Sequence, residues 1–121
     1  MWLDDNYIDG TIPPEIGKYS SLASMSISKA NLKGKIPAEI GNMSELRRLW
    51  LFDNELTGTI PDSLDKLNLL EVVELHQNKL QGQMPNGVCK AVQKADYDYK
   101  SLTSDCNSEV TCSKSCCTQC Y

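Results

Sequence analysis

The sequence predicts a solenoid of stacked units with one parallel β-strand in each unit. A Gly-x-Ile-Pro phrase begins at Gly10, Gly34 and Gly58, and a fragment of it begins at Gly82, so the starts recur at a constant period of 24. Apolar residues recur at the same period. The cysteines begin only at Cys89, after the repeated region. Fixed apolar columns at a period of about 20 to 50 residues are typical of stacked units that share one core.

The apolar columns define the predicted core. The longest columns are Leu3, Ile27, Leu51 and Leu75; Ile8, Leu32, Leu56 and Leu80; Ile12, Ile36, Ile60 and Met84; and Ile16, Ile40, Leu64 and Val88. Shorter columns begin at Tyr19, Leu22 and Met25. We expect all of these side chains to point inward.

Each unit is predicted to begin with a strand. In LRRLWLFDN, which begins at Leu46, the apolar residues Leu49 and Leu51 alternate with Trp50 and Phe52, which is the period of a strand. Strands that recur once per unit run parallel, about 4.8 Å apart.

A turn follows each strand. Asn6, Asn54 and Asn78 stand at this place in three units. A buried Asn there can hydrogen-bond backbone groups of its own turn and of the neighbouring turn. The Gly of the phrase permits a tight backbone path, and the Pro prevents a β-ladder from continuing. The segment after Pro is too short for a long α-helix, so we predict one turn of 3-10 backbone.

The segment LRRLWLFDNELTGTIPDSLDKLNLL closely resembles the consensus of plant-type extracellular leucine-rich repeats, LxxLxLxxNxLxGxIPxxIGxLxxL. The resemblance covers residues 1 to about 90. It implies an α/β, L domain-like fold. This is a right-handed arc with a curved parallel sheet on its concave face and short 3-10 turns on its convex face. The tail LTSDCNSEVTCSKSCCTQCY resembles the Cys-rich C-terminal caps of secreted leucine-rich-repeat proteins from diatoms and related algae.

Two features depart from the repeat pattern. Ala30 occupies the Asn column, and Asn31 lies one residue out of register. An Ala side chain cannot make the backbone hydrogen bonds, so we expect the second turn to be held less tightly. The chain also starts in the middle of a unit, which leaves Leu3 and Ile8 at an open apolar end. Terminal repeats normally carry a polar cap, so we expect the chain to be part of a longer protein.

The register changes after Val88. An offset of 29, in place of 24, aligns Leu70, Val73 and Leu75 with Tyr99, Leu102 and Ser104. We therefore predict that AVQKADYDY is a connector with an insertion, that YKSLTSDCN is the last strand, and that the Cys-rich end covers its edge. The expected domains are the repeats at 1–88, in four units of which the first is truncated, and a cap at 89–121.

Six cysteines crowd into this predicted cap. They are Cys89, Cys106, Cys112, Cys116, Cys117 and Cys120. An even number in one terminal segment favours structural disulfides and an oxidising compartment. Zinc binding and redox catalysis by CTQC are the alternatives. The tail lacks two separated zinc-ligand pairs, and no thioredoxin-like strand and helix surround CTQC. Sequence alone does not select the pairing, although the register favours a bond from Cys89 to Cys116 or Cys117.

The strand positions that alternate with the core columns are predicted to form the binding surface. Trp50, Phe52 and Arg48 offer large apolar area with a charged anchor, which is typical of binding hot spots. Packing of the aromatics on one another is the alternative interpretation. The predicted contact residues are Arg48, Trp50, Phe52, Val72, Glu74, His76 and Trp2.

Catalysis and metal binding are not predicted. His76 is the only histidine, and no Ser or Cys nucleophile lies near it in the repeat pattern, so we expect a surface contact role. Asp4 and Asp5 lie about two repeats from Asp53, roughly 10 Å at the strand spacing, too far to share one ion. No cofactor is predicted. Asn42-Met43-Ser44 is an N-glycosylation sequon, and we expect Asn42 to face solvent.

The net charge and the length of the apolar runs limit the classes of partner that the sequence predicts. The net charge of −4 gives no basis for electrostatic binding of nucleic acid. No apolar run reaches membrane-spanning length, and no secretory leader precedes Trp2. From the cysteines and the family resemblance we expect the chain to lie outside the cell or at its surface, and we predict no signal peptide within the sequence given.

The expected function is therefore non-catalytic recognition of a protein, peptide or cell-wall glycan on the concave face. One alternative is a structural C-terminal segment of a longer leucine-rich-repeat receptor or inhibitor. Ice binding is less favoured, because Lys35 interrupts the column of Thr11, Thr59 and Gln83.

Overall fold

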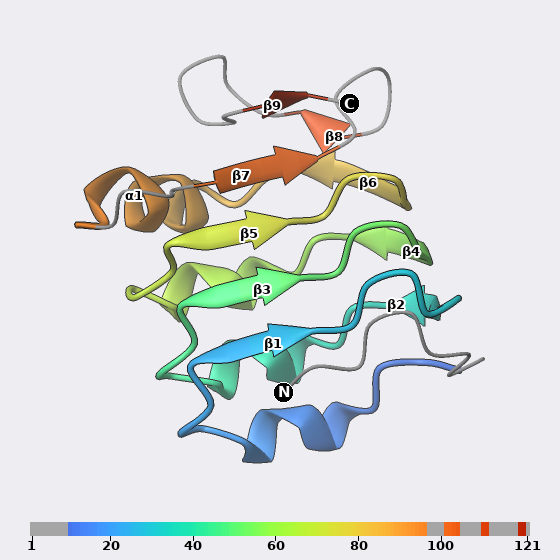
Figure 1. The fold of residues 1–121 in the computed structure, drawn as a ribbon, viewed down its shortest axis with the longest axis horizontal. Helices are drawn as coiled ribbons and strands as arrows, with labels where there is room; N and C mark the ends of the chain where they lie inside the picture. The colour runs from blue at the N-terminus through green and yellow to red at the C-terminus, as the bar shows by residue number, and fades with distance from the viewer. Residues whose placement is uncertain (1–9, 97–100, 105–109, 112–118, 121) are drawn as a thin grey trace.

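The computed structural model describes residues 10–96, 101–104, 110–111 and 119–120, with backbone alone for the last two pairs. Two parallel sheets are joined by short helices in every unit (Figure 1). Figure 1 shows the strands of the first sheet stacked in chain order from β1 to β9. The predicted fold class, a solenoid with a parallel sheet and short 3-10 turns, is confirmed.

The first sheet contains the predicted strands, in the order β1-β3-β5-β7-β9. Their bounds are Ser24–Ser26 (β1), Arg48–Trp50 (β3), Val72–Glu74 (β5), Ser101–Ser104 (β7) and Gln119–Cys120 (β9). Met25 pairs with Leu49 and Leu49 with Val73, so strand partners follow the period of the repeat. Val73 then pairs with Leu102, so the predicted change of register after Val88 is confirmed.

The prediction that YKSLTSDCN forms the last strand was wrong. Beyond β7 the sheet continues with β9, where Thr103 pairs with Gln119 and Ser104 with Cys120. The reason is that an exposed strand edge offers unpaired backbone groups, and the C-terminal segment supplies partners for them.

A second sheet was missed by the sequence analysis. It has the order β2-β4-β6-β8, with bounds Lys33–Lys35 (β2), Glu55–Thr59 (β4), Lys79–Gln83 (β6) and Val110–Thr111 (β8). β2, β4 and β6 each contain the glycine that begins a Gly-x-Ile-Pro phrase or its fragment, and these glycines, Gly34, Gly58 and Gly82, have φ of 76°, 77° and 88°. These left-handed angles strain any residue with a Cβ atom. The prediction of a tight backbone path at glycine agrees with these angles, whereas the pairing of these segments with neighbouring units was not predicted.

Short helices follow the prolines. The 3-10 helices are Pro14–Lys18 (η1), Ala38–Asn42 (η2) and Asp62–Lys66 (η3), and the fourth unit has an α-helix, Asn86–Lys94 (α1). In η1 the backbone nitrogen of Ile16 donates to the oxygen of Pro13, three residues earlier. The predicted connector AVQKADYDY therefore begins inside a helix. Asp65 in η3 accepts a hydrogen bond of 2.7 Å from the backbone nitrogen of Gly87, which ties η3 to α1.

The apolar columns fill the space between the sheets and the helices. Met25, Leu49, Val73 and Leu102 are each 0% exposed. The columns of Leu51, Leu56, Ile60 and Leu64 are also buried wherever the structure describes them. The predicted core is confirmed for these residues, but the inward position expected for Tyr19 was wrong, because Tyr19 is 56% exposed while Met43 and Leu67 in the same column are buried.

The turn at Ala30 is held from the next unit. Asn54 accepts hydrogen bonds from the backbone nitrogens of Ala30 and Leu32, and its Nδ2 atom donates to the Ile27 oxygen at 2.7 Å. Ala30 cannot make the bond within its own turn that Asn54 makes to the Leu51 oxygen and Asn78 to the Leu75 oxygen, so a looser turn at Ala30 stays a prediction.

Asn31 changes this turn in a different way. Lys29, Asp53 and Gln77 all have positive φ, at 54°, 58° and 57°. Among the three turns that the structure describes, only the one at Ala30 adds a second such residue, Asn31, at 56°. An extended conformation is then not available at Asn31. β2 nevertheless has 3 residues where β4 has 5 for another reason, because β4 pairs with β2 at 55–57 and with β6 at 57–59, whereas β2 pairs with a named strand on one side only.

Candidate ligand-binding face

The outer side of the first sheet presents the predicted binding residues. Because side chains alternate along a strand, the neighbours of Met25, Leu49, Val73 and Leu102 point away from the core. Register places Arg48 between Ser24 and Val72, and Trp50 between Ser26 and Glu74. We call this side of β1, β3, β5 and β7 the β-face.

Trp50 and Phe52 form the apolar centre of the β-face. Trp50 ends β3 and Phe52 follows it, and both side chains are half-buried. Their positions are fixed by Leu49 and Leu51, which are 0% exposed on the opposite side of the same segment. Partly exposed aromatics on a rigid element can bury large area against a partner at low entropic cost.

His76 supports Phe52 from the neighbouring unit. The two rings are stacked, with centroids 4.9 Å apart and planes 4° from parallel. His76 Nδ1 lies 2.6 Å from Thr103 Oγ1, so the imidazole is also held from β7. His76 is only 8% exposed, so the expectation of a surface contact role was wrong. The strand register places Thr103 beside Glu74, and so within reach of His76. The sequence analysis did not predict the contact between His76 and Thr103.

Val72 was also assigned wrongly. It has the outward register position that the sequence predicted, but its side chain is 0% exposed and cannot contact a ligand. Its strand partner Arg48 has a long side chain whose Nη2 reaches Glu71, the residue next to Val72, at 3.5 Å. A small apolar side chain flanked in this way is covered by its neighbours.

Glu71 orders two arginines at the edge of the β-face, and sequence reasoning missed it. Its carboxylate lies 3.1 Å from Arg47 Nη1 and 3.5 Å from Arg48 Nη2. Glu71 is 9% exposed, whereas the Arg48 side chain is 33% exposed. Glu71 thus restrains Arg48 but leaves part of it open to solvent. The sequence feature that could have indicated this ion pair is the position of Glu71, one repeat after Arg47.

The structure describes some of the remaining residues that the sequence singled out, and others lie outside the described ranges. Glu74 is half-buried on the β-face, and Asn42 and Ser44 of the sequon are exposed, as expected for Asn42. Cys89 is half-buried on α1 and is disulfide-bonded. Trp2, Asp4, Asp5 and four of the cysteines lie outside the described residues, and Cys120 has only its backbone described.

The described residues offer no obvious metal site. No group of three or more His, Cys, Asp or Glu side chains in this part of the chain could hold a metal ion. Among the same residues, no helix is long and apolar enough to cross a membrane. The β-face presents two aromatic rings, an arginine and a glutamate. This combination suits binding to a protein surface or to a polypeptide chain.

Comparison with known proteins places this geometry in context. The Leucine Rich Repeat family matches residues 45–67. A search of curated proteins finds no significant match. Among solved structures, a TDR receptor is 38% identical, with a TM-score of 0.65, over 68% of this chain and 14% of that chain.

Two structures from Arabidopsis thaliana are also similar. The leucine-rich-repeat ectodomain of the receptor kinase SOBIR1 is 29% identical, with a TM-score of 0.66, over 77% of this chain and 47% of that one. The receptor kinase HAESA, in complex with the peptide hormone IDA and the co-receptor SERK1, is 29% identical, with a TM-score of 0.67, over 79% of this chain and 16% of that one. The chain spans less than half the length of each. It carries a leucine-rich repeat and has the leucine-rich-repeat fold, similar to that of plant receptor ectodomains.

Proposed function

We propose that this protein is a non-catalytic recognition module that binds an extended peptide or a protein surface across the β-face. The observation that carries the proposal is the pair of half-buried aromatics, Trp50 and Phe52, on a strand segment whose other side is fully buried. Arg48 and Glu74 flank the pair with opposite charges, which would orient a bound segment.

Two further observations support recognition. Phe52 is stacked on His76, so one half of the aromatic surface is already ordered before a ligand arrives. Ordering in advance lowers the entropic cost of binding. The HAESA structure, which has the same fold, contains a peptide hormone and a co-receptor. A protein or peptide therefore fits as the ligand class, with peptide the form we favour, and a cell-wall glycan is the third class that the sequence suggested.

We place the protein outside the cell or at its surface, as part of a longer leucine-rich-repeat protein. The similarity to the ectodomain of SOBIR1 supports this placement. Residues 89–121 would then be a C-terminal cap in which all six cysteines form disulfides, and the bonded state of Cys89 supports that proposal. Asn42 would carry an N-glycan, since both Asn42 and Ser44 are exposed.

A second candidate function is a structural one, in which this segment ends a longer solenoid. The backbone of β8 pairs with β6 and that of β9 pairs with β7, so the C-terminal segment extends both sheets. Binding by the isolated chain would favour recognition, and binding only by a longer parent protein would favour the structural role.

The test is a selection of peptides that bind the isolated chain, followed by calorimetry on variants. We expect Trp50→Ala to weaken binding by about 2 kcal/mol or more while the thermal unfolding temperature changes little. Tyr19→Ala is the matched control, because Tyr19 is an aromatic with 56% exposure on a different part of the surface. Equal losses for the two variants, or normal binding by folded Trp50→Ala, would exclude the β-face as the binding site.

A further inference from the structure

The contact between η3 and α1 has room for a side chain from one helix only. Between η2 and η3 the glycine is on the earlier helix, since a Cβ atom added to Gly41 would lie 2.6 Å from the Cβ atom of Ser63. Between η3 and α1 the glycine is on the later helix, because a Cβ atom added to Gly87 would lie 2.7 Å from the Cα atom of Asp65. The close approach to Asp65 therefore requires glycine at position 87.

This glycine follows Asn86, and together they are the only Asn-Gly dipeptide in the sequence. In such a pair the backbone nitrogen of the glycine can attack the side-chain amide of the asparagine, because no side chain on the glycine obstructs the approach. A bond forms between the Gly87 nitrogen and Asn86 Cγ, the Cγ–Nδ2 bond breaks, and the amide nitrogen leaves as ammonia with the proton from Gly87. Water then opens the resulting cyclic imide at either carbonyl, which gives aspartate or isoaspartate.

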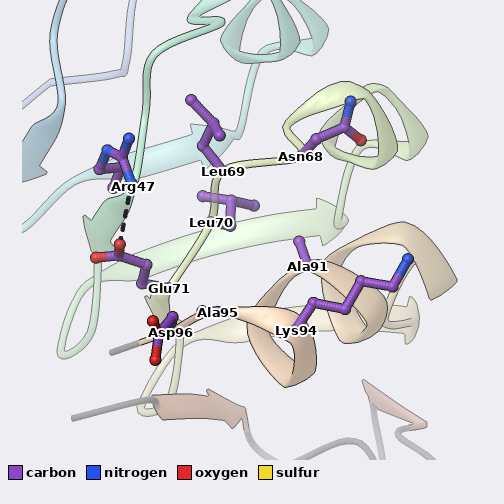
Figure 2. A pocket seen from close by; sticks show the side chains of 9 residues that line it. All are labelled: Arg47, Asn68, Leu69, Leu70, Glu71, Ala91, Lys94, Ala95 and Asp96. Carbon is purple, nitrogen blue, oxygen red and sulfur yellow. Dashed lines mark hydrogen bonds and ion pairs between the residues drawn. The ribbon is translucent and has the colours of Figure 1, made fainter. Parts of the chain in front are cut away.

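The start of α1 is open to water. Asn86 is exposed and Gly87 is half-buried. A hollow of about 370 Å³ lies beside them and is lined by Asp65, Gly87 and Lys90. A second hollow, of about 250 Å³, separates the later turns of α1 from the segment that joins η3 to β5 (Figure 2). Water therefore has room to reach the Asn86–Gly87 peptide and to hydrolyse an imide formed there.

One hydrogen bond opposes the reaction. Asp65 Oδ1 accepts from the backbone nitrogen of Gly87 at 2.7 Å, and so pairs an N–H group at the start of α1 that has no partner within the helix. Ring closure requires Asn86 and Gly87 to leave the helical conformation, and helix ends do so more readily than helix interiors. The bond to Asp65 holds them in place. The carboxylate also disfavours loss of the Gly87 amide proton, since negative charge would then develop beside it.

We propose that Asn86 is a site of spontaneous deamidation and that its contact with η3, through Asp65 and Gly87, sets the rate. Opening of this contact starts the reaction, and the product makes the opening permanent. Deamidation adds a negative charge near Asp65, and isoaspartate also lengthens the backbone by a methylene group, so the first turn of α1 does not re-form as before. The proposal is independent of the β-face, because it uses none of the residues assigned to recognition there.

The experiment follows the whole chain during timed incubation in mildly alkaline buffer, with peptide mass spectrometry to measure the deamidated fraction at Asn86. Asp65→Ala should deamidate about tenfold faster than the parent, as expected for the loss of one hydrogen bond to a charged group. Asp62→Ala is the matched control, because it removes the same charge from an exposed position in the same helix. Equal rates for Asp65→Ala and the parent, or equal acceleration in the control, would overturn the proposal.

A second measurement separates the folded contact from the chemistry of the dipeptide. In guanidinium chloride the contact is absent, so the parent and Asp65→Ala should react at one rate, faster than the folded parent. A difference between them that persists in the unfolded chain would refute the role of the contact. Asn86→Gln should abolish the modification at this position. Equally fast deamidation of Asn42, which is exposed but precedes Met43, in folded Asp65→Ala would refute Asn86 as the preferred site.

Discussion

The Oδ1 atom of Asn54 lies 3.0 Å from the backbone nitrogen of Ala30, one unit earlier in the chain. The same side chain bonds Leu32 in that unit and the Leu51 oxygen in its own unit. Asn78 repeats the arrangement one unit later, with bonds to Leu56, Leu51 and Leu75. Each of these side chains therefore joins two neighbouring turns. The turn at Ala30 has no Asn in this column, so the side-chain hydrogen bonds to it come from Oδ1 and Nδ2 of Asn54 in the next unit.

Asn54→Ala should lower the free energy of unfolding by about 2–4 kcal/mol, because it leaves several buried backbone groups without partners. Urea denaturation followed by circular dichroism measures this. Asn42→Ala is the control, since Asn42 is exposed and should change stability by about 0.5 kcal/mol or less. An effect of Asn54→Ala no larger than that of the control would contradict the role given to the Asn column.

Leu51→Ala should destabilise the protein by about 2–5 kcal/mol, because it opens a cavity in a fully buried column. Glu55→Ala should stay within about 0.5 kcal/mol. Its carboxylate lies 3.7 Å from Lys79, and the two side chains are 47% and 66% exposed, so solvent screens the pair. Guanidinium unfolding of the two variants compares them directly, and similar midpoints would show that the core is wrongly placed.

Lys29→Gly should stabilise the protein by about 0.5–1 kcal/mol. Lys29 has a φ of 54°, which costs any residue with a Cβ atom roughly 1 kcal/mol, whereas glycine adopts it freely. Lys29→Ala removes the same charge but keeps the Cβ atom, so its stability should match the parent. Differential scanning calorimetry distinguishes the two variants, and destabilisation by glycine would rule out strain at this position.

Thr103→Val should destabilise the protein by about 1–3 kcal/mol, because it removes the hydroxyl that lies 2.6 Å from His76 Nδ1 in a buried site. The change in shape is small, so packing contributes little. Thr57→Val, on the exposed side of β4, is the matched control and should be nearly neutral. Near-ultraviolet circular dichroism should also report a change around Phe52, which stacks on His76. Identical stability and spectra would mean that the pair does not order the β-face.

The sequence predicted the core and the first sheet well, because both depend on local alternation and a constant period. Leu49 and Leu51 could be assigned inward from their columns alone. The period even identified the strand partner of Val73 across the insertion, at Leu102. The second sheet was missed because its strands contain a glycine with positive φ, as at Gly58, and this interrupts the alternation by which strands are recognised.

The candidate site was harder to predict, since outward direction does not determine exposure. Val72 and His76 occupy outward positions, but neighbours cover them. The stacking of Phe52 on His76 is one such contact, and a repeat pattern does not contain it. Glu71 escaped notice for a related reason, because its importance lies in the ends of two arginine side chains from another unit.

The two sheets have different registers, and this has a geometric consequence. In the first sheet Leu49 faces Val73, its equivalent in the next unit, whereas in the second sheet Gly34 faces Leu56, which comes two positions before the equivalent Gly58. Equivalent residues therefore step by two positions, roughly 7 Å, along the strands of the second sheet, but not along those of the first. A rigid unit can satisfy both steps only by rotating relative to the unit before it. A stack of such units follows a screw path, so a long ligand that follows one column across many units must wind around the protein.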